Sequence, residues 1–256
     1  MTETITDKQE VSKQEPETVD EAMDDDDEEN EVGIPLAVLP QHDKLVTEND
    51  EPLNNIFLDK QQRLLVDSLY TSWRNMGQSS PFAAFAKVGV FYSTDEPAFT
   101  PDVCLSRITM PKDIMLKKYS AYYAWYYGRS PEVMVEIVTN DSGEEETTKM
   151  QAYLRIAVPF YVIFDPLEYL KKGILRVYGR WPGKYEPMEN NWLPSLKLGF
   201  TVWQGAFEGA EAAWLRLCNK DGRLFLTGAE LAQKERLRAD KFAAKLRSLG
   251  IDPNRL

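Results

Sequence analysis

Three ionisable side chains, Asp102, Glu136 and Lys149, lie within or next to apolar segments in the middle of the chain. Ionised groups are rare in such segments unless they are paired or bind a metal. Two carboxylates can hold a hard cation such as Mg²⁺ through oxygen ligands, with water completing its coordination. Such a cation stabilises charge on a phosphate and activates a water, and a nearby ammonium group can orient that water. The three residue types together are typical of metal-assisted phosphodiester hydrolysis.

Glu136 belongs to a segment with a strand, helix, strand pattern. Residues 133–138 are mostly apolar, which predicts a central strand, and Glu132 and Glu136 share one face of it. A helix follows, and residues 160–164 form a second apolar run. Two strands joined through a helix imply a parallel pair with a right-handed crossover. Glu132 is a further ligand or a salt-bridge partner.

The helix between these strands carries Lys149. Ser142 and Glu145 match a capping box, in which the serine caps a free amide and the glutamate reaches back. Lys149 and Tyr153 are four residues apart, so we expect them to share one edge of the helix.

Asp102 lies in the region before this unit. Residues 82–92 and 99–106 predict two strands around a turn. Because Pro101 cannot donate to a strand ladder, it should lie at the entrance of the second strand, with Asp102 near an end or edge. Further upstream, the apolar spacing within residues 57–76 predicts the first helix of the domain.

The charge of the chain is unevenly distributed. The first 50 residues hold 17 Asp and Glu against 3 Lys, a net charge of −14. We interpret residues 1–55 as a disordered acidic tail and linker. The other 206 residues carry 27 Lys and Arg against 24 Asp and Glu, a net charge of +3. We expect residues 56–205 to form the main domain and residues 206–256 a C-terminal hairpin and charged helix.

Cysteine and histidine are scarce. Cys104 and Cys218 are the only cysteines and His42 is the only histidine, which excludes a disulfide framework and indicates a reducing cytoplasm. Catalytic triads with histidine and histidine-ligated metals cannot be built in the predicted domain. No apolar run approaches the ~20 residues of a membrane span, and the N-terminus is not a signal sequence. We expect a cytoplasmic protein without membrane contact.

The C-terminal region carries two further signals. Residues 214–218 and 224–226 flank an Asn-Lys-Asp-Gly turn, which predicts a hairpin. Thr227 and Glu230 predict a second capping box that opens a charged helix. The apolar residues of this helix do not form a sustained heptad pattern, so packing on the domain and self-association both stay open.

Four motifs follow one another in order: Pro101-Asp102, residues 136–139, Lys149 with Tyr153, and residues 158–166. Their order and approximate spacing resemble those of the Uma-type restriction endonuclease family, a branch of the PD-(D/E)XK nuclease superfamily. The resemblance covers residues 57–205. It implies a restriction-endonuclease-like fold of the α/β (α+β) class, with a central mixed β-sheet flanked by helices. It also implies a divalent metal, Mg²⁺ with Mn²⁺ as a substitute, and nucleic acid, DNA in the first place, as the substrate.

The chain departs from the superfamily pattern at one position. The usual lysine lies two residues after the glutamate, on the same strand face, where it reaches the same water. That position is Val138 here, and the resemblance implies that Lys149 supplies the ammonium group from the next helix. The leading hypothesis is therefore a Mg²⁺-dependent endonuclease in which Asp102 and Glu136 hold the metal and Lys149 positions the attacking water.

Residues 107–130 are rich in basic and aromatic side chains. We expect some of the basic residues to contact substrate phosphates. These candidate substrate-binding residues are Lys112, Lys117, Lys118 and Arg129. The aromatic side chains could stack on bases or pack over the sheet, and we favour packing for most of them.

Each candidate also has an ordinary structural interpretation. Asp102 could be a strand-entry residue and Lys149 a solvated helix residue, while Tyr153 is better explained as core packing. The alternative function is a catalytically inactive nuclease-like fold that binds nucleic acid or a protein partner. A third hypothesis places the acidic tail over the basic surface as an autoinhibitor. Because one site of this type cuts one strand, cutting both would need a homodimer or rebinding.

Overall fold

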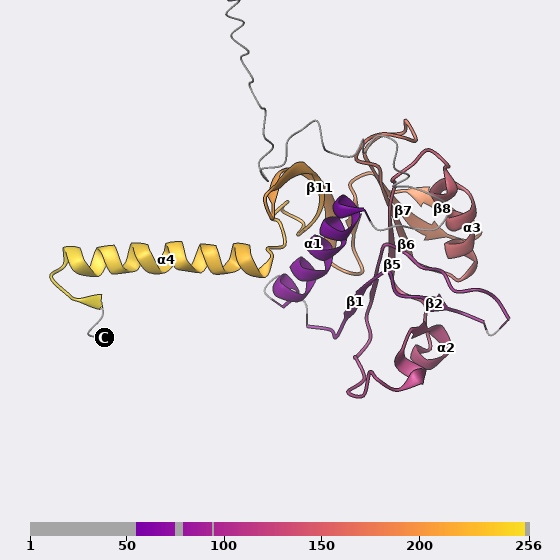
Figure 1. Cartoon of the computed structure of the whole chain (residues 1–256), viewed down its shortest axis with the longest axis horizontal. Helices are drawn as coiled ribbons and strands as arrows, with labels where there is room; N and C mark the ends of the chain where they lie inside the picture. Colours follow the sequence, from indigo (N-terminus) through magenta and orange to yellow (C-terminus); the bar gives the residue numbers. More distant parts are fainter. Residues whose placement is uncertain (1–54, 75–78, 94, 254–256) are drawn as a thin grey trace, which may run out of the picture. The chain divides into compact units, whose positions relative to one another are not determined.

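The computed structural model describes residues 55–74, 79–93 and 95–253 (Figure 1). All of these residues fall within one compact unit, Thr47–Leu256. The predicted acidic tail and linker at residues 1–55 lie outside the described residues, apart from the last position.

A six-stranded sheet forms the centre of this unit, in the strand order β1-β3-β5-β6-β7-β8. Its strands are β1 (Ala83–Ala86), β3 (Val103–Ser106), β5 (Val133–Ile137), β6 (Phe160–Phe164), β7 (Leu175–Trp181) and β8 (Lys184–Pro187). β5 and β6 pair in parallel, and all other neighbours pair antiparallel. The prediction of a central mixed sheet is confirmed.

The connection between β5 and β6 is the predicted helical crossover. It consists of a 3-10 turn, η4 (Glu144–Glu146), and the helix α3 (Thr148–Arg155). The predicted capping box of Ser142 and Glu145 is wrong. The residues that precede η4 and α3 are Gly143 and Thr147, and no side chain caps either element. Gly143 has a positive φ of 72°, and the extra 3-10 turn moves the start of α3 away from Ser142.

Two separate hydrophobic clusters cover the two faces of this sheet, since successive side chains of a strand point to opposite faces. Val133, Val135 and Ile137 pack with Leu65 and Leu69 of helix α1 (Ile56–Ser72). On the other face, Met134 and Val138 belong to the cluster that contains Tyr153 of α3. Figure 1 shows α1 and α3 on opposite sides of the sheet. Glu136 therefore points to the side that α3 covers.

The strand predicted at residues 82–92 is divided in two. β1 ends at Ala86, and the short β2 (Val90–Phe91) pairs in parallel with β4 (Tyr122–Tyr123). The break follows from Lys87, whose φ of 53° cannot continue a strand. Two further short elements lie between β3 and β5, the 3-10 helix η3 (Lys117–Tyr119) and the helix α2 (Ala124–Tyr127).

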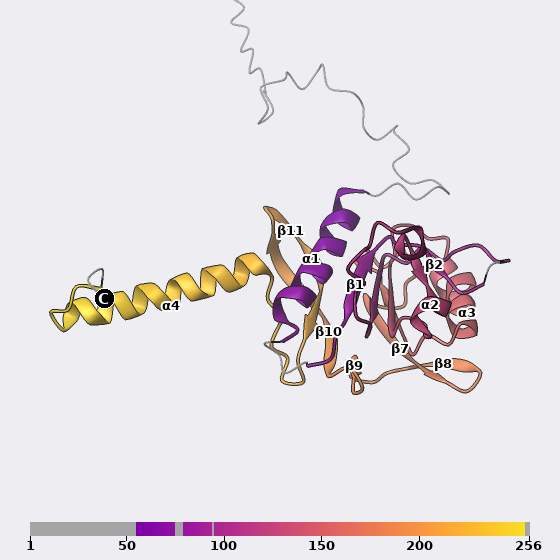
Figure 2. The same cartoon turned by 90° about the horizontal axis from the view of Figure 1, so that it is seen from below.

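A second sheet packs beside α1, in the order β11-β10-β9. Its strands are β9 (Trp192–Leu193), β10 (Leu198–Phe207) and β11 (Ala210–Cys218), and Figure 2 shows β10 and β11 next to α1. Gln61 of α1 joins this sheet, since its side chain exchanges two hydrogen bonds with the backbone of Leu215. The hairpin predicted after Cys218 is reduced to an isolated bridge with Leu224, closed by two backbone hydrogen bonds, Asn219 N–H to Arg223 O and Phe225 N–H to Leu217 O. The division predicted after residue 205 falls inside β10.

Helix α4 (Gly228–Ser248) begins with the predicted capping box. Thr227 Oγ1 accepts a hydrogen bond from the Glu230 backbone N–H, and the Glu230 carboxylate accepts one from the Thr227 backbone N–H. No residue of α4 is buried. Within the part of the chain that the structure describes, no helix is long and apolar enough to cross a membrane.

Candidate active site

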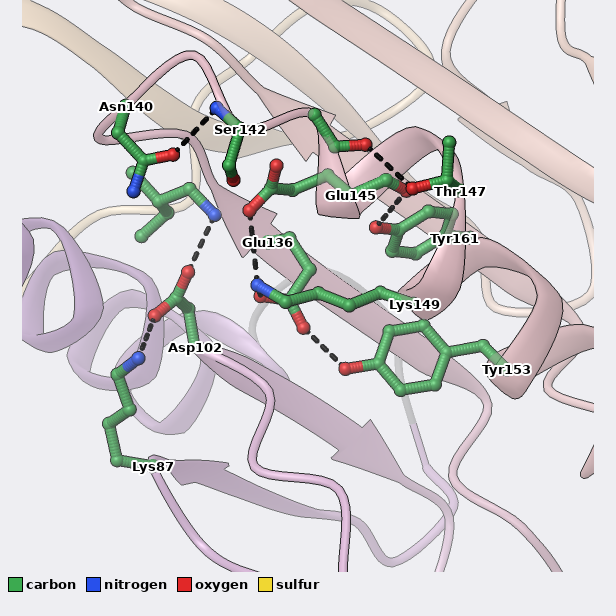
Figure 3. Close-up of polar contacts among 12 residues, drawn as sticks. Lys87, Asp102, Glu136, Asn140, Ser142, Glu145, Thr147, Lys149, Tyr153 and Tyr161 are labelled. Carbon is green, nitrogen blue, oxygen red and sulfur yellow. Dashed lines mark hydrogen bonds and ion pairs between the residues drawn. The ribbon is translucent and has the colours of Figure 1, made fainter. Parts of the chain in front are cut away.

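Asp102 lies at the entrance of β3, where Pro101 leaves no backbone donor for a strand ladder. Its side chain is buried, with 2% of the residue exposed. One carboxylate oxygen, Oδ2, accepts the Ile137 backbone N–H at 2.6 Å. The other, Oδ1, lies 2.5 Å from Lys87 Nζ (Figure 3). It also lies 3.3 Å from Gln62 Nε2. The carboxylate is therefore fixed in direction by partners from three other segments.

Glu136 lies in β5 beside Asp102. β3 and β5 pair antiparallel with Val103 opposite Val135, so the next residues along the two strands are Asp102 and Glu136. Glu136 is 1% exposed. The strand register thus places two buried carboxylates on neighbouring strands. Glu136 points to the side that α3 covers, while Asp102, at the strand entrance, also reaches Gln62 of α1.

Lys149 and Tyr153, one turn apart on α3, both contact Glu136 (Figure 3). Lys149 Nζ lies 3.0 Å from Glu136 Oε2 and 3.0 Å from Glu145 Oε1. The Tyr153 hydroxyl donates to Glu136 Oε1. The predicted helix edge therefore supplies a partner to each oxygen of Glu136.

The ionisation of these groups follows from their burial and their neighbours. Burial and, to a smaller extent, the nearby charge of Asp102 raise the pKa of Glu136 to about 7, against the opposing effect of Lys149. Burial by itself would lower the pKa of Lys149, but the carboxylates of Glu136 and Glu145 outweigh it and raise that pKa above its ordinary value. Burial and Glu136 also raise the pKa of Tyr153. At neutral pH the lysine is charged and the tyrosine is a neutral donor.

The donor set fits a hard divalent cation. Among the described residues, no group of three or more His, Cys, Asp and Glu side chains is arranged to hold a metal. Mg²⁺, however, often takes only one or two protein carboxylates and completes its octahedron with water and substrate phosphate. The buried cluster has three carboxylates, on Asp102, Glu136 and Glu145, against the ammonium groups of Lys87 and Lys149, which leaves one negative charge in excess when Glu136 is ionised. Oε2 of Glu145 is a buried oxygen without a hydrogen-bond partner.

Glu132, the other carboxylate on this face, is a salt-bridge partner. Its oxygens accept the Arg107 backbone N–H at 2.7 Å and approach Arg107 Nε at 3.3 Å. Arg129 Nη2 lies 2.7 Å from Glu132 Oε1. The structure thus decides between the two roles that the sequence left open for Glu132.

The predicted substrate-binding residues lie elsewhere. They are on the segment that leaves the end of β3 opposite to Asp102 and returns to β5. Lys112, Lys117 and Lys118 are exposed, and Arg129 is engaged with Glu132. The described contacts link none of these four residues to the carboxylate pair.

Sequence reasoning did not assign Lys87 and Glu145 to the site. Glu145 carried a signal, since it lies four residues before Lys149 and can share a helix edge with it. No sequence pattern indicated a role for Lys87, because its contact with Asp102 depends on the positive φ of Lys87 after the end of β1.

The whole arrangement lies within the span of a known family. The Uma2 family model, described as "Putative restriction endonuclease", matches residues 51–208. This span is more than half of the chain and includes Asp102, Glu136 and Lys149. Among the curated proteins, no match to the chain is found.

Proposed function

The chain belongs to the Uma2 family, and we propose that it hydrolyses phosphodiester bonds of DNA with the help of a divalent metal. The observation that carries this proposal is the buried pair of Asp102 and Glu136, with the Lys149 ammonium group 3.0 Å from Glu136. Carboxylates from two neighbouring strands and an ammonium group are the chemistry that metal-assisted hydrolysis requires.

Each residue of the site has a distinct part in the proposed reaction. Asp102 and Glu136 would hold Mg²⁺, or Mn²⁺ as a substitute. When bound, the cation would supply charge stabilisation at the scissile phosphate and a lowered pKa for the attacking water. Lys149 orients this water by hydrogen bonding, and Glu145 keeps the ammonium group in place. Tyr153 fixes the orientation of the Glu136 carboxylate.

Supply of the ammonium group from α3 is consistent with the packing around β5. Val138, two residues after Glu136, is buried in the apolar cluster below α3, where a lysine ammonium could not be solvated. Lys149 reaches Glu136 from the first turn of α3 instead. The helix therefore takes over the role that a lysine on the strand has elsewhere in the superfamily.

The proposal is tested by metal binding and DNA cleavage with the full-length chain. Calorimetry with Mg²⁺ and Mn²⁺ should show binding that Asp102→Asn and Glu136→Gln weaken strongly. The matched control is Glu132→Gln, which changes a buried carboxylate of the same sheet face outside the pair. A folded Glu136→Gln protein that cuts DNA as fast as the wild type would contradict the assignment.

An inactive nuclease-like fold that binds nucleic acid or a protein partner is the second candidate. It is favoured by the two ion pairs, Lys87 with Asp102 and Lys149 with Glu136, since paired carboxylates can be purely structural. DNA binding that needs no metal, without cleavage in Mg²⁺ or Mn²⁺, would support this candidate over the first.

Cleavage of both strands would require a second cleavage event. A homodimer or rebinding of a nicked product would provide it, and sedimentation of the full-length protein with and without DNA separates the two.

A further inference from the structure

A pocket of about 420 Å³ lies at the C-terminal end of α3. This volume is within the ~300–1,000 Å³ range of ligand sites, in a shallow depression that is open to solvent. Three of its lining residues, Tyr92, Ala124 and Ile156, pack in the same hydrophobic cluster as Tyr153. The pocket is therefore on the same side of the central sheet as Glu136, and the proposed reaction does not use it.

An exposed aromatic group borders the pocket. Trp125 lines it and is 45% exposed, and its neighbour Tyr126 is 55% exposed. Behind them, the ring of Tyr123 lies 5.2 Å from that of Trp125 and stacks on Phe91 at 5.3 Å. Trp125 is thus supported by other rings while part of its own surface stays open to a ligand.

Two arginines complete the lining. The Arg155 guanidinium lies over the Tyr92 ring, 5.2 Å from its centroid, and donates to the Tyr92 hydroxyl and to Glu96. Arg129 is held by Glu132 and by the Arg107 carbonyl. A guanidinium group has five N–H donors, so after these contacts both arginines retain donors that a phosphate can accept.

We propose that this pocket binds one unpaired nucleotide of a DNA strand, with the base on Trp125 and a phosphate on Arg129 or Arg155. Stacking on an aromatic side chain next to guanidinium groups is how proteins bind single-stranded nucleic acid. A base inside a duplex is stacked on both faces, so it cannot offer a face to the indole. The inference rests on the proposed nuclease function and names its substrate class: DNA that contains single-stranded nucleotides.

The position of the pocket relative to the carboxylate pair supports this substrate. Lys149 and Arg155 lie six residues apart on α3, a distance of about 9 Å along the helix axis. On the same side, Tyr92 stacks on Phe99 at 5.2 Å, and Phe99 meets the edge of Tyr153 at 5.5 Å. Ser130 of the pocket and Glu136 are six residues apart on the segment that forms β5, roughly 20 Å in extended chain. One strand passing along α3 would therefore have a nucleotide in the pocket and a phosphodiester a few nucleotides away near the carboxylates.

Fluorescence anisotropy with labelled oligonucleotides tests the pocket. The full-length chain is titrated in EDTA with a short single strand and with a duplex of the same sequence. Trp125→Ala should weaken single-strand binding by about 5- to 150-fold and leave duplex binding unchanged. Arg155→Gln should also weaken it, and Trp125→Phe, which keeps a ring, should retain part of the affinity. The matched control is Trp181→Ala, because Trp181 is 58% exposed and does not line the pocket.

The outcomes separate the pocket from the nuclease function, because EDTA removes cleavage from the measurement. Unchanged single-strand affinity in Trp125→Ala would overturn the pocket proposal even for a protein that cuts DNA. Equal weakening for single strand and duplex would overturn the selectivity for unpaired nucleotides. Selective weakening in a protein that cuts nothing would keep the pocket and reject the nuclease function. Thermal melting confirms that each variant is folded.

Discussion

Glu132 and Glu136 are two buried glutamates on the same face of the same strand segment, but their surroundings differ in charge. Glu132 is held by two guanidinium groups, from Arg107 and Arg129, so positive charge exceeds negative charge around it. Glu136 shares its one ammonium group with Glu145 and lies beside a further carboxylate, Asp102. A carboxylate whose charge is compensated by guanidinium groups stabilises the fold. An excess of buried negative charge instead favours the binding of a cation.

Among the substitutions that test this difference between Glu132 and Glu136, replacement of Lys149 should have the largest effect. We expect Lys149→Ala to reduce the cleavage rate by about 10²- to 10³-fold, because in the proposed reaction the attacking water would lose its positioning donor. Lys172→Ala is the control, since it removes a lysine that pairs with Glu146 outside the site. Steady-state rates at saturating DNA measure the effect. An unchanged rate would mean that Lys149 is only a structural partner of Glu136, as Arg107 and Arg129 are of Glu132.

Glu136→Gln should stabilise the metal-free protein. The pKa of Glu136 is raised to about 7 from an ordinary 4.5, so the folded state holds this proton more tightly than the unfolded state. Stability is therefore lost as the pH rises from about 4.5 to 7, and glutamine abolishes that loss. We expect a gain on the order of 1 to 3 kcal/mol at pH 8 in EDTA. Urea denaturation at pH 4.5 and pH 8 checks this, and a loss of stability at pH 8 would contradict it.

The same substitution at Glu132 should have the opposite sign. Glu132→Gln removes the charge that Arg107 and Arg129 share, and we expect a loss of roughly 1 to 2 kcal/mol. Both arginines are partly exposed and can be hydrated, which keeps the loss moderate. Denaturation of the two variants side by side shows whether the signs differ. If both substitutions change stability in the same direction, the charges around Glu132 and Glu136 do not differ as proposed.

The smallest effect is expected for Tyr153→Phe. The hydroxyl group favours the ionised form of Glu136, so its removal should raise the pKa of Glu136 further. Because a metal binds the ionised carboxylate, Mg²⁺ binding should weaken near pH 6 to 7 and stay unchanged at higher pH. Calorimetry across this pH range checks the shift, and a uniform loss at every pH would indicate a packing defect.

The strand, helix, strand unit could be predicted because its signals are local. Alternation within residues 133–138 and the apolar run at residues 160–164 set both strands, and the intervening helix fixes them as parallel. Lys149 and Tyr153 reach Glu136 because four residues correspond to about one helical turn. Spacing thus predicted that Lys149 and Tyr153 share a helix edge, whereas the family resemblance implied the role of Lys149 beside Glu136.

Other parts of the site depend on contacts between distant segments. Lys87 reaches Asp102 only because the chain leaves β1 with a positive φ, which no residue pattern indicated. Glu145 was interpreted as a capping residue because the sequence does not show the extra 3-10 turn before α3. Lys112, Lys117 and Lys118 were proposed from composition, which does not tell at which end of β3 a loop will lie, and their contact with substrate stays a prediction.

Helix α4 is attached to the rest of the unit mainly through its first turn. Arg216 of β11 is fully buried and makes a bidentate ion pair with Glu230, at 2.9 Å and 2.7 Å, next to the capping box. Beyond that turn no residue of α4 is buried. Backbone amides near Glu230 should therefore exchange slowly with deuterated solvent, while those toward Ser248 exchange quickly. A protease should be able to shorten the helix from its C-terminal end without unfolding the two sheets.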